Sequence, residues 1–184
     1  YVLGGALVFG SLFGFINSAQ QLIGEGFGAG EDFPLIFAFC ALCMGVANWS
    51  NSRIVERFGA RRVSHTALFV FVAVSVAQVA NALQSAPSLW VFVPLMAANM
   101  SLLGFIGANF SSIAMQPFRA IAGAASSVHS FVRSSLGAAL GGAIGYAYDG
   151  TALPLAVSLL GTALASLALV LYSERGRLFG PPVA

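Results

Sequence analysis

Six long apolar stretches, separated by short polar breaks, make up the hydropathy pattern of this sequence. They run over residues 1–23, 33–51, 63–83, 89–115, 121–148 and 154–172, with bounds good to about a few residues. A helix that crosses the hydrocarbon core of a bilayer needs about 20 apolar residues, and each stretch is near that length. The pattern therefore predicts an all-α membrane protein with six transmembrane helices. The polar end of the chain, residues 173–184, predicts a flexible tail.

The composition supports this class and excludes others. Apolar residues make up 58% of the 184 residues and charged residues only 8%, whereas an ordinary soluble domain is about 25% charged. We therefore expect membrane lipid as a partner and no nucleic acid. No hydrolase triad, phosphate loop or metal cluster is visible, so we expect neither an enzyme nor a cofactor or metal. The chain begins inside an apolar stretch, and we expect it to be a piece of a longer protein.

Basic residues alternate with acidic ones from loop to loop when six spans are threaded. Arg53, Arg57, Arg61 and Arg62 lie after the second stretch, Arg119 after the fourth, and Arg175 and Arg177 in the tail. The other loops carry Glu25, Glu31, Asp32 and Asp149. Because Arg-rich loops stay in the cytoplasm, both ends of the chain are predicted to be cytoplasmic.

Residues 52–62 read S-R-I-V-E-R-F-G-A-R-R and predict a short cytoplasmic turn between two spans. Gly59 stands between two basic clusters, where a tight turn needs a left-handed or otherwise strained residue.

This segment resembles the signature loop of the major facilitator superfamily, which has the form G-x-x-x-D-R-x-G-x-R-R. Residues 56–62 match its D-R-x-G-x-R-R part in register, while Ser52 replaces the leading Gly and Glu56 replaces the Asp. Both departures favour the C-terminal half of such a transporter. N-S-R-I-V-E-R-F-G-A-R-R-V, together with A-G-A-A-S-S-V and Y-D-G-T-A-L-P further on, is similar to the Bcr/CflA drug-resistance branch. The alternative is a solvated basic loop of some other membrane protein.

The resemblance implies a specific assembly and mechanism. The chain would supply the seventh to twelfth helices of a twelve-helix exporter in a bacterial inner membrane, paired with an N-terminal six-helix half. The first, second, fourth and fifth helices would line a cavity for a small molecule and, in a drug:proton antiporter, protons. A cytoplasmic latch that pairs with neighbouring helix ends would consist of Glu56, Arg57, Gly59, Arg61 and Arg62.

The fifth stretch carries the most unusual residues. Gly137, Gly141 and Gly145 repeat every four positions and form a bare ridge that admits a close neighbour, either for sliding or for plain packing. His129 and Arg133 share a helix face, and Arg133 lies near the middle of the span. A charge at that depth is costly and should face a cavity or a partner, unless it reaches an interface by snorkelling.

Amides on two other stretches are candidates for the same cavity, although helix–helix hydrogen bonds explain them equally well. They are Asn17, Gln20 and Gln21 on the first stretch and Asn99 and Asn109 on the fourth. All six carboxylates lie at loops or span ends. We therefore expect the counter-charge of Arg133 in the missing half, or from water and an anionic substrate group. Cys40 and Cys43 lie in an apolar stretch and predict no disulfide or metal site.

Together these patterns favour a secondary transporter that works by alternating access. Two alternatives remain open at this point. One is a complete six-helix transporter that acts as a dimer, and the other is a membrane sensor or scaffold without transport.

Overall fold

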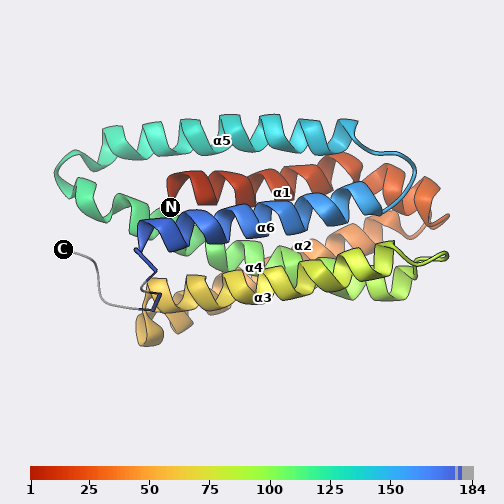
Figure 1. The fold of residues 1–184 in the computed structure, drawn as a ribbon, viewed down its shortest axis with the longest axis horizontal. Coiled ribbons are helices and arrows are strands. Elements are labelled where there is room, and N and C mark those ends of the chain that lie inside the picture. Colours follow the sequence, from red (N-terminus) through yellow and green to blue (C-terminus); the bar gives the residue numbers. More distant parts are fainter. Residues whose placement is uncertain (177, 180–184) are drawn as a thin grey trace.

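The structure, a computed structural model, describes residues 1–176 and 178–179, apart from the side chain of Arg119. Its described part is all-helical, and six α-helices lie side by side along the long axis of the molecule (Figure 1). The helices are α1 (Val2–Gln21), α2 (Phe33–Phe58), α3 (Ala60–Ala82), α4 (Leu89–Met115), α5 (Ala122–Tyr146) and α6 (Leu153–Ser173). The predicted all-α architecture is thus confirmed for the described residues.

Five of these helices are long and apolar enough to cross a membrane: α1, α2, α3, α4 and α6. The exception is α5, which has 25 residues but is rich in Gly and Ser and contains both His129 and Arg133. Helix α5 lies alongside α1 (Figure 1). The helices thus fit a membrane-embedded protein, with one helix whose residues are suited to protein or polar contacts rather than lipid.

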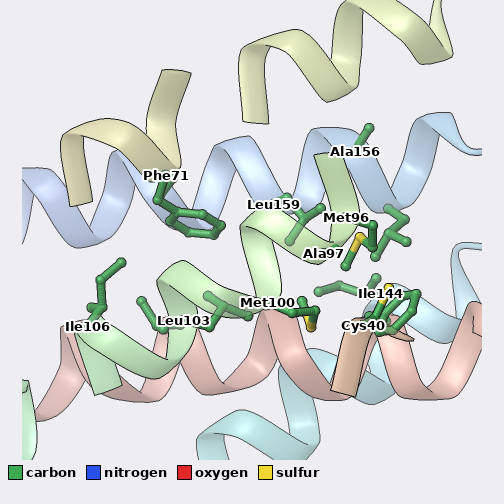
Figure 2. Packing of buried hydrophobic residues seen from close by; sticks show 14 of the residues in the cluster. Cys40, Phe71, Met96, Ala97, Met100, Leu103, Ile106, Ile144, Ala156 and Leu159 are labelled. Carbon is green, nitrogen blue, oxygen red and sulfur yellow. The ribbon is translucent and has the colours of Figure 1, made fainter. Parts of the chain in front are cut away.

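Helix α4 is the centre of the apolar core and packs against α1, α2 and α3. Met96, Met100, Leu103 and Ile106 follow one another along it, each at most 4% exposed, and Figure 2 shows them in line with Phe71 of α3 nearby. Helix α1 packs on α5 and α6 as well as α4, whereas α2 packs mainly on α4. The outer sides of α2 and α5 consequently remain uncovered.

The turn predicted over residues 52–62 is wrong in extent, because the structure shortens it to one residue. Helix α2 continues to Phe58 and α3 begins at Ala60. The segment I-V-E-R-F contains no Gly or Pro that would break a helix. Gly59 alone leaves the helical conformation, at φ 80° and ψ 150°, a region that is essentially restricted to glycine. The expectation of a strained backbone at Gly59 is confirmed.

Two other boundaries differ from the expected ones. The residues after Gln21 do not form a loop at once, because one wide π-helical turn, Leu22–Gly26, extends α1 first. Between α4 and α5 a short 3-10 turn, Gln116–Ile121, kinks at Phe118.

The described part of the tail contacts the bundle, and the flexibility expected of residues 173–184 stays a prediction. The ring of Phe179 lies 5.6 Å from that of His65 and 6.3 Å from that of Phe69, measured between centroids. Its backbone N–H donates to His65 Nδ1 at 3.3 Å. Residues 177 and 180–184, including Arg177, lie outside the described residues.

Charges separate between the two ends of the bundle. The α2–α3 junction, the turn Gln116–Ile121 and the end of α6 lie at one end, while the α1–α2, α3–α4 and α5–α6 connections lie at the other (Figure 1). The first end contains Arg53, Arg57, Arg61, Arg62 and Arg175, and the second contains Glu25, Glu31, Asp32 and Asp149. We call the first the arginine end; it also contains Glu56 and Glu174.

Candidate functional site

Arg133, His129 and Ser111 form a polar group between α4 and α5, in which His129 is buried and the other two side chains are partly buried. The Arg133 Nη1 group donates to Ser111 Oγ at 3.4 Å, and the same hydroxyl lies 3.2 Å from His129 Nε2. The two residues of α5 are one turn apart and so reach the same serine of α4. We call these three residues the Arg133 site.

An aromatic ring closes one side of the Arg133 site. The Cζ atom of Arg133 lies 4.1 Å from the centroid of Phe9 on α1. Cation–π contact of this kind stabilises a guanidinium by about 0.5–1 kcal/mol when exposed and about 2 kcal/mol when desolvated. It fixes the plane of the guanidinium but supplies no hydrogen-bond acceptor.

The hydrogen-bonding capacity of the Arg133 site is incompletely used. Arg133 Nε and His129 Nδ1 are buried without a hydrogen-bond partner, and His129 is only 8% exposed. Among the described residues the structure shows one ion pair, and it does not include Arg133. Arg133 is partly buried, and a cation removed from water without a counter-charge is unfavourable, so this site has the capacity to bind an acceptor, above all an anion.

Other polar residues lie on the side of α4 that faces α2. Asn109 donates to Asn51 Oδ1 at 2.7 Å and to its own helix at the Phe105 carbonyl at 2.8 Å. A Cβ placed on Gly104 would meet Asn48 Oδ1 at 2.8 Å, so α2 and α4 approach closely here. Asn109 therefore lies in a helix–helix hydrogen bond that bridges α2 and α4.

Asn99 points elsewhere, so the structure does not bring the two amides of α4 together. It is fully buried, and its Oδ1 accepts from Ser75 Oγ of α3 at 3.5 Å. The Nδ2 group of Asn99 and both side-chain polar atoms of Gln78 on α3 are buried without a partner. Asn99 thus belongs to the α3–α4 contact.

The amides of α1 lie at the opposite end of that helix from the arginine end. Asn17, Gln20 and Gln21 are all exposed. The Cβ of Asn17 is close to Gly145 of α5, and the Gln21 carbonyl accepts from the Tyr148 hydroxyl at 3.2 Å. The structure separates these residues from Arg133 by several turns of helix.

The glycine ridge of α5 faces α1. A Cβ on Gly137 would lie 2.8 Å from the Phe9 ring and one on Gly145 would lie 3.0 Å from the Asn17 Cβ. One on Gly141 would overlap the Phe13 Cβ and lie 2.9 Å from the Phe13 carbonyl carbon. The two helices therefore approach as closely as their backbones allow. Plain packing thus accounts for the ridge, and a role in sliding stays a prediction.

At the arginine end, Glu174 joins three helices. Arg61 Nε donates to Glu174 Oε1 at 2.9 Å, and the Tyr1 hydroxyl donates to the same oxygen at 2.5 Å. His65 Nε2 lies 2.9 Å from the Tyr1 hydroxyl. We call these four residues the Glu174 cluster. Since the hydroxyl already donates to Glu174 and His65 Nδ1 accepts from Phe179, the His65 proton lies on Nε2.

The cluster shifts the pKa of two groups that lie outside the spans. Burial alone would raise the pKa of Glu174, but hydrogen bonds from Tyr1 and Arg61 outweigh it and hold the pKa below its ordinary value. Burial, reinforced by the hydrogen bond to Glu174, raises the pKa of the Tyr1 hydroxyl. The Glu174 carboxylate is consequently charged at neutral pH, and the Tyr1 hydroxyl is not.

Of the five predicted latch residues, Arg61 forms an ion pair with the end of another helix, at Glu174. Glu56, Arg57 and Arg62 are exposed, and Arg57 lies over its neighbour Phe58, with 5.3 Å between its Cζ and the ring centroid. Their pairing with other helix ends stays a prediction. Gly59 sets the angle between α2 and α3.

Sequence reasoning missed several residues at these sites. Ser111 and Asn51 are polar residues within or at the edge of apolar stretches, and a polar residue in such a position is a sequence signal for a buried hydrogen bond. Phe9 carried none, because it is one of 16 Phe and only the tertiary structure shows which of them faces Arg133.

No family model matches the chain, and no curated protein or solved structure matches it.

Proposed function

We propose that this chain is one six-helix half of a secondary transporter of the major facilitator type, similar to the Bcr/CflA branch. It exports a small molecule in exchange for protons by alternating access across a bacterial inner membrane. The observation that carries the proposal is Arg133, a cation near the middle of α5 that makes no ion pair within the described residues. In the proposed six-helix half α5 crosses the membrane, and a cation at that depth is usually part of a substrate pathway.

The surface of α4 supports a passage rather than a sealed core. Ala108 and Ser112 are exposed, and at 100° per residue they lie between Ser111 and Asn109 around the helix. The Arg133 site borders this strip on the α5 side and Asn109 on the α2 side. Small and polar residues along an uncovered strip suit water and a solute, whereas lipid favours large apolar residues.

The uncovered sides of α2 and α5 suit a second six-helix unit. Such a unit would close the passage across the strip on α4, either as another part of the same polypeptide or as a second copy. Rocking of the two units about the Arg133 site would then expose it alternately to either side. His129 would exchange the coupled proton, because imidazole titrates most readily near neutral pH.

The arginine end would be cytoplasmic and would act in this rocking as a latch. The charges on Glu56 and Arg57 are exposed at the end of α2, where they can pair with the second unit in one state and separate in the other. The Arg61–Glu174 pair would remain closed, because it joins helices of the same half.

A reconstituted transport assay tests the proposal. The full-length protein would be placed in proteoliposomes with an acidic lumen and offered labelled chloramphenicol, ethidium and 4-phenylbutyrate in turn. We expect gradient-driven accumulation of at least one compound. Arg133→Ala should reduce it about tenfold or more, as a lost charge-assisted contact implies. Arg53→Ala is the matched control, since Arg53 is exposed and lies over Trp49 at 4.4 Å. Equal transport by both variants would contradict the assignment.

The latch is tested separately with Arg57→Ala, again against Arg53→Ala. Both side chains are exposed and lie over an aromatic ring, so loss of a surface arginine alone affects them equally. We expect Arg57→Ala to slow transport without lowering the amount of protein in the membrane. Normal transport by this variant would show that the basic residues at the α2–α3 junction set only the orientation in the membrane and do not act as a latch.

The orientation has its own test, in a variant without Cys40 and Cys43. Ser85→Cys, in the α3–α4 connection, should react with an impermeant maleimide in intact cells, and Ala60→Cys should not. Reaction at position 60 under these conditions would overturn the cytoplasmic placement of the arginine end.

A further inference from the structure

The Arg133 site contains donors that exceed its acceptors. Arg133 offers five N–H groups, and the contacts it makes are a long hydrogen bond of 3.4 Å to Ser111 and the face of Phe9. The hydrogen bond is longer than the usual 2.7–3.2 Å or so. A serine oxygen is also neutral, so it leaves the charge uncompensated. The site therefore fits an anion better than any neutral group.

The planar edge of the Arg133 guanidinium defines the geometry of an anion that would fit the site. Phe9 lies over the face of the group, so hydrogen bonds can form only along its planar edge, and the Nε on that edge is buried without a partner. Two parallel N–H groups in one plane match the two oxygens of a carboxylate. Lysine could not provide this arrangement.

His129 extends the site by one more polar atom. Its Nε2 lies near Ser111 Oγ, and its Nδ1 is buried without a partner. Both Arg133 and His129 approach the same serine, which places their polar groups around one small volume. A carboxylate there would meet the charge of Arg133 and the ring of His129 together.

An apolar pocket begins at His129. It has a volume of about 350 Å³ and lies between the end of α4, the turn Gln116–Ile121 and the first turns of α5. Its lining includes Met115, Phe118, Ala125, Val128 and Val132 besides His129. Pockets that hold small molecules start at about 300 Å³ and are mostly apolar with a few polar groups. This pocket offers no partner for a second charge, because His129 is its one titratable lining residue.

We propose that the Arg133 site and this pocket together bind an amphipathic organic anion, with its carboxylate at Arg133 and its apolar body in the pocket. This inference rests on the proposed transport function for its biological role and names the substrate class. The binding itself does not depend on transport. Ser111 and His129 orient the carboxylate, Arg133 neutralises it, and the pocket excludes solutes without an apolar part.

Equilibrium binding to the full-length protein in nanodiscs tests the inference, with labelled 4-phenylbutyrate as the probe. Its neutral isostere, 4-phenylbutyramide, has the same apolar body without the charge. We expect the carboxylate to bind at least tenfold more tightly than the amide. Arg133→Gln should remove this preference, and Arg133→Lys should restore only part of it. Arg53→Gln, at the arginine end, should leave it unchanged.

The pocket has an independent test in Ala125→Phe, which places a ring in the pocket without touching the charge. We expect it to weaken carboxylate binding tenfold or more, whereas Ser126→Phe, at an exposed position beside it, should not. Thermal unfolding of each variant separates a lost site from a lost fold, and a destabilised Arg133→Gln is replaced by Ser111→Ala, which should weaken binding severalfold.

Three outcomes would overturn the proposal. They are equal binding of carboxylate and amide, carboxylate binding that does not depend on residue 133, and displacement of the amide and the carboxylate alike by uncharged lipid chains. The proposed function fails differently. Charge-selective binding without any transport in proteoliposomes would leave the site intact and refute the transporter. Transport that Arg133→Ala reduces, together with equal binding of the carboxylate and the amide, would leave the transporter intact and refute the anion site.

Discussion

Gly141 and Gly142 are adjacent on α5 but lie in opposite environments, which makes a strict test of the α1–α5 contact. Gly142 is exposed and has no atom within 4 Å of a Cβ added there. Gly141 is buried, and a Cβ added there would overlap the Phe13 Cβ and lie 2.9 Å from the Phe13 carbonyl carbon and 3.0 Å from the Gly14 nitrogen. Two of these atoms belong to the backbone of α1, so no side-chain rotation relieves the contact.

The structure gives the size of the effect. Ordinary contact begins near 3.4 Å, so the Gly141→Ala variant must separate the two helices by at least ~0.5 Å. A gap of about 0.5 Å already forfeits roughly a quarter of the dispersion energy of each affected contact. The close contacts at Gly137 and Gly145 loosen with it because they lie on the same ridge. Overpacking of this kind costs about 1–3 kcal/mol.

Gly142→Ala should act in the opposite direction. Alanine in a helix interior is more favourable than glycine by about 0.5–1 kcal/mol, and no contact opposes it. The two variants differ by the position of one methyl group, so they should differ in unfolding free energy by about 1.5–4 kcal/mol.

The measurement is equilibrium unfolding of the purified protein in mixed detergent–lipid micelles, followed by circular dichroism at several denaturant concentrations. Gly141→Ala should shift the midpoint downward and Gly142→Ala should leave it or raise it. If the two variants unfold at the same midpoint, α5 does not pack on α1 through this ridge.

Three further predictions follow from local geometry. Gly59→Ala should lower the unfolding free energy by about 1–3 kcal/mol because of the backbone conformation at that residue, whereas Gly45→Ala, in an open helical position, should not lower it; equal stabilities would show that the α2–α3 junction tolerates other conformations. Glu174 has a depressed pKa, so its stabilisation is present above about pH 4.5, its ordinary value, and is lost as the pH falls through the lower pKa of the folded state. Unfolding measured from pH 7 to pH 3 should therefore show an acid-dependent loss that Glu174→Gln lacks, and parallel curves would argue against a stabilising carboxylate. Asn109→Ala leaves Asn51 Oδ1 without its donor and should destabilise the protein by about 0.6–1.7 kcal/mol in the same micelles; an unchanged free energy of unfolding would show that the hydrogen bond between Asn109 and Asn51 is not stabilising.

The helical class, the number of helices and the separation of charge between the two ends can all be predicted from the sequence. These are local properties: the length of an apolar stretch decides whether a helix can span a membrane, and the order of basic and acidic loops along the chain decides which charges gather at each end of the bundle. The strained backbone at Gly59 is also predictable from the local sequence, because a glycine between two basic clusters marks a tight turn. The continuation of α2 through residues 52–58 is equally local, because the charged residues there predict a loop by composition although none of them breaks a helix.

Which residues contact one another depends on how the helices pack and cannot be predicted from the sequence. Asn99 and Asn109 belong to the same helix, yet the first contacts α3 and the second contacts α2. Arg61, rather than Glu56 or Arg57, found a partner, and that partner lies at the far end of the sequence, on Glu174. The physical reason is that helices in a bilayer are apolar on nearly every side, so their sequences lack the polar face that marks the outside of a soluble helix. The direction of each side chain then depends on which neighbours pack around it, and that is a property of the whole bundle.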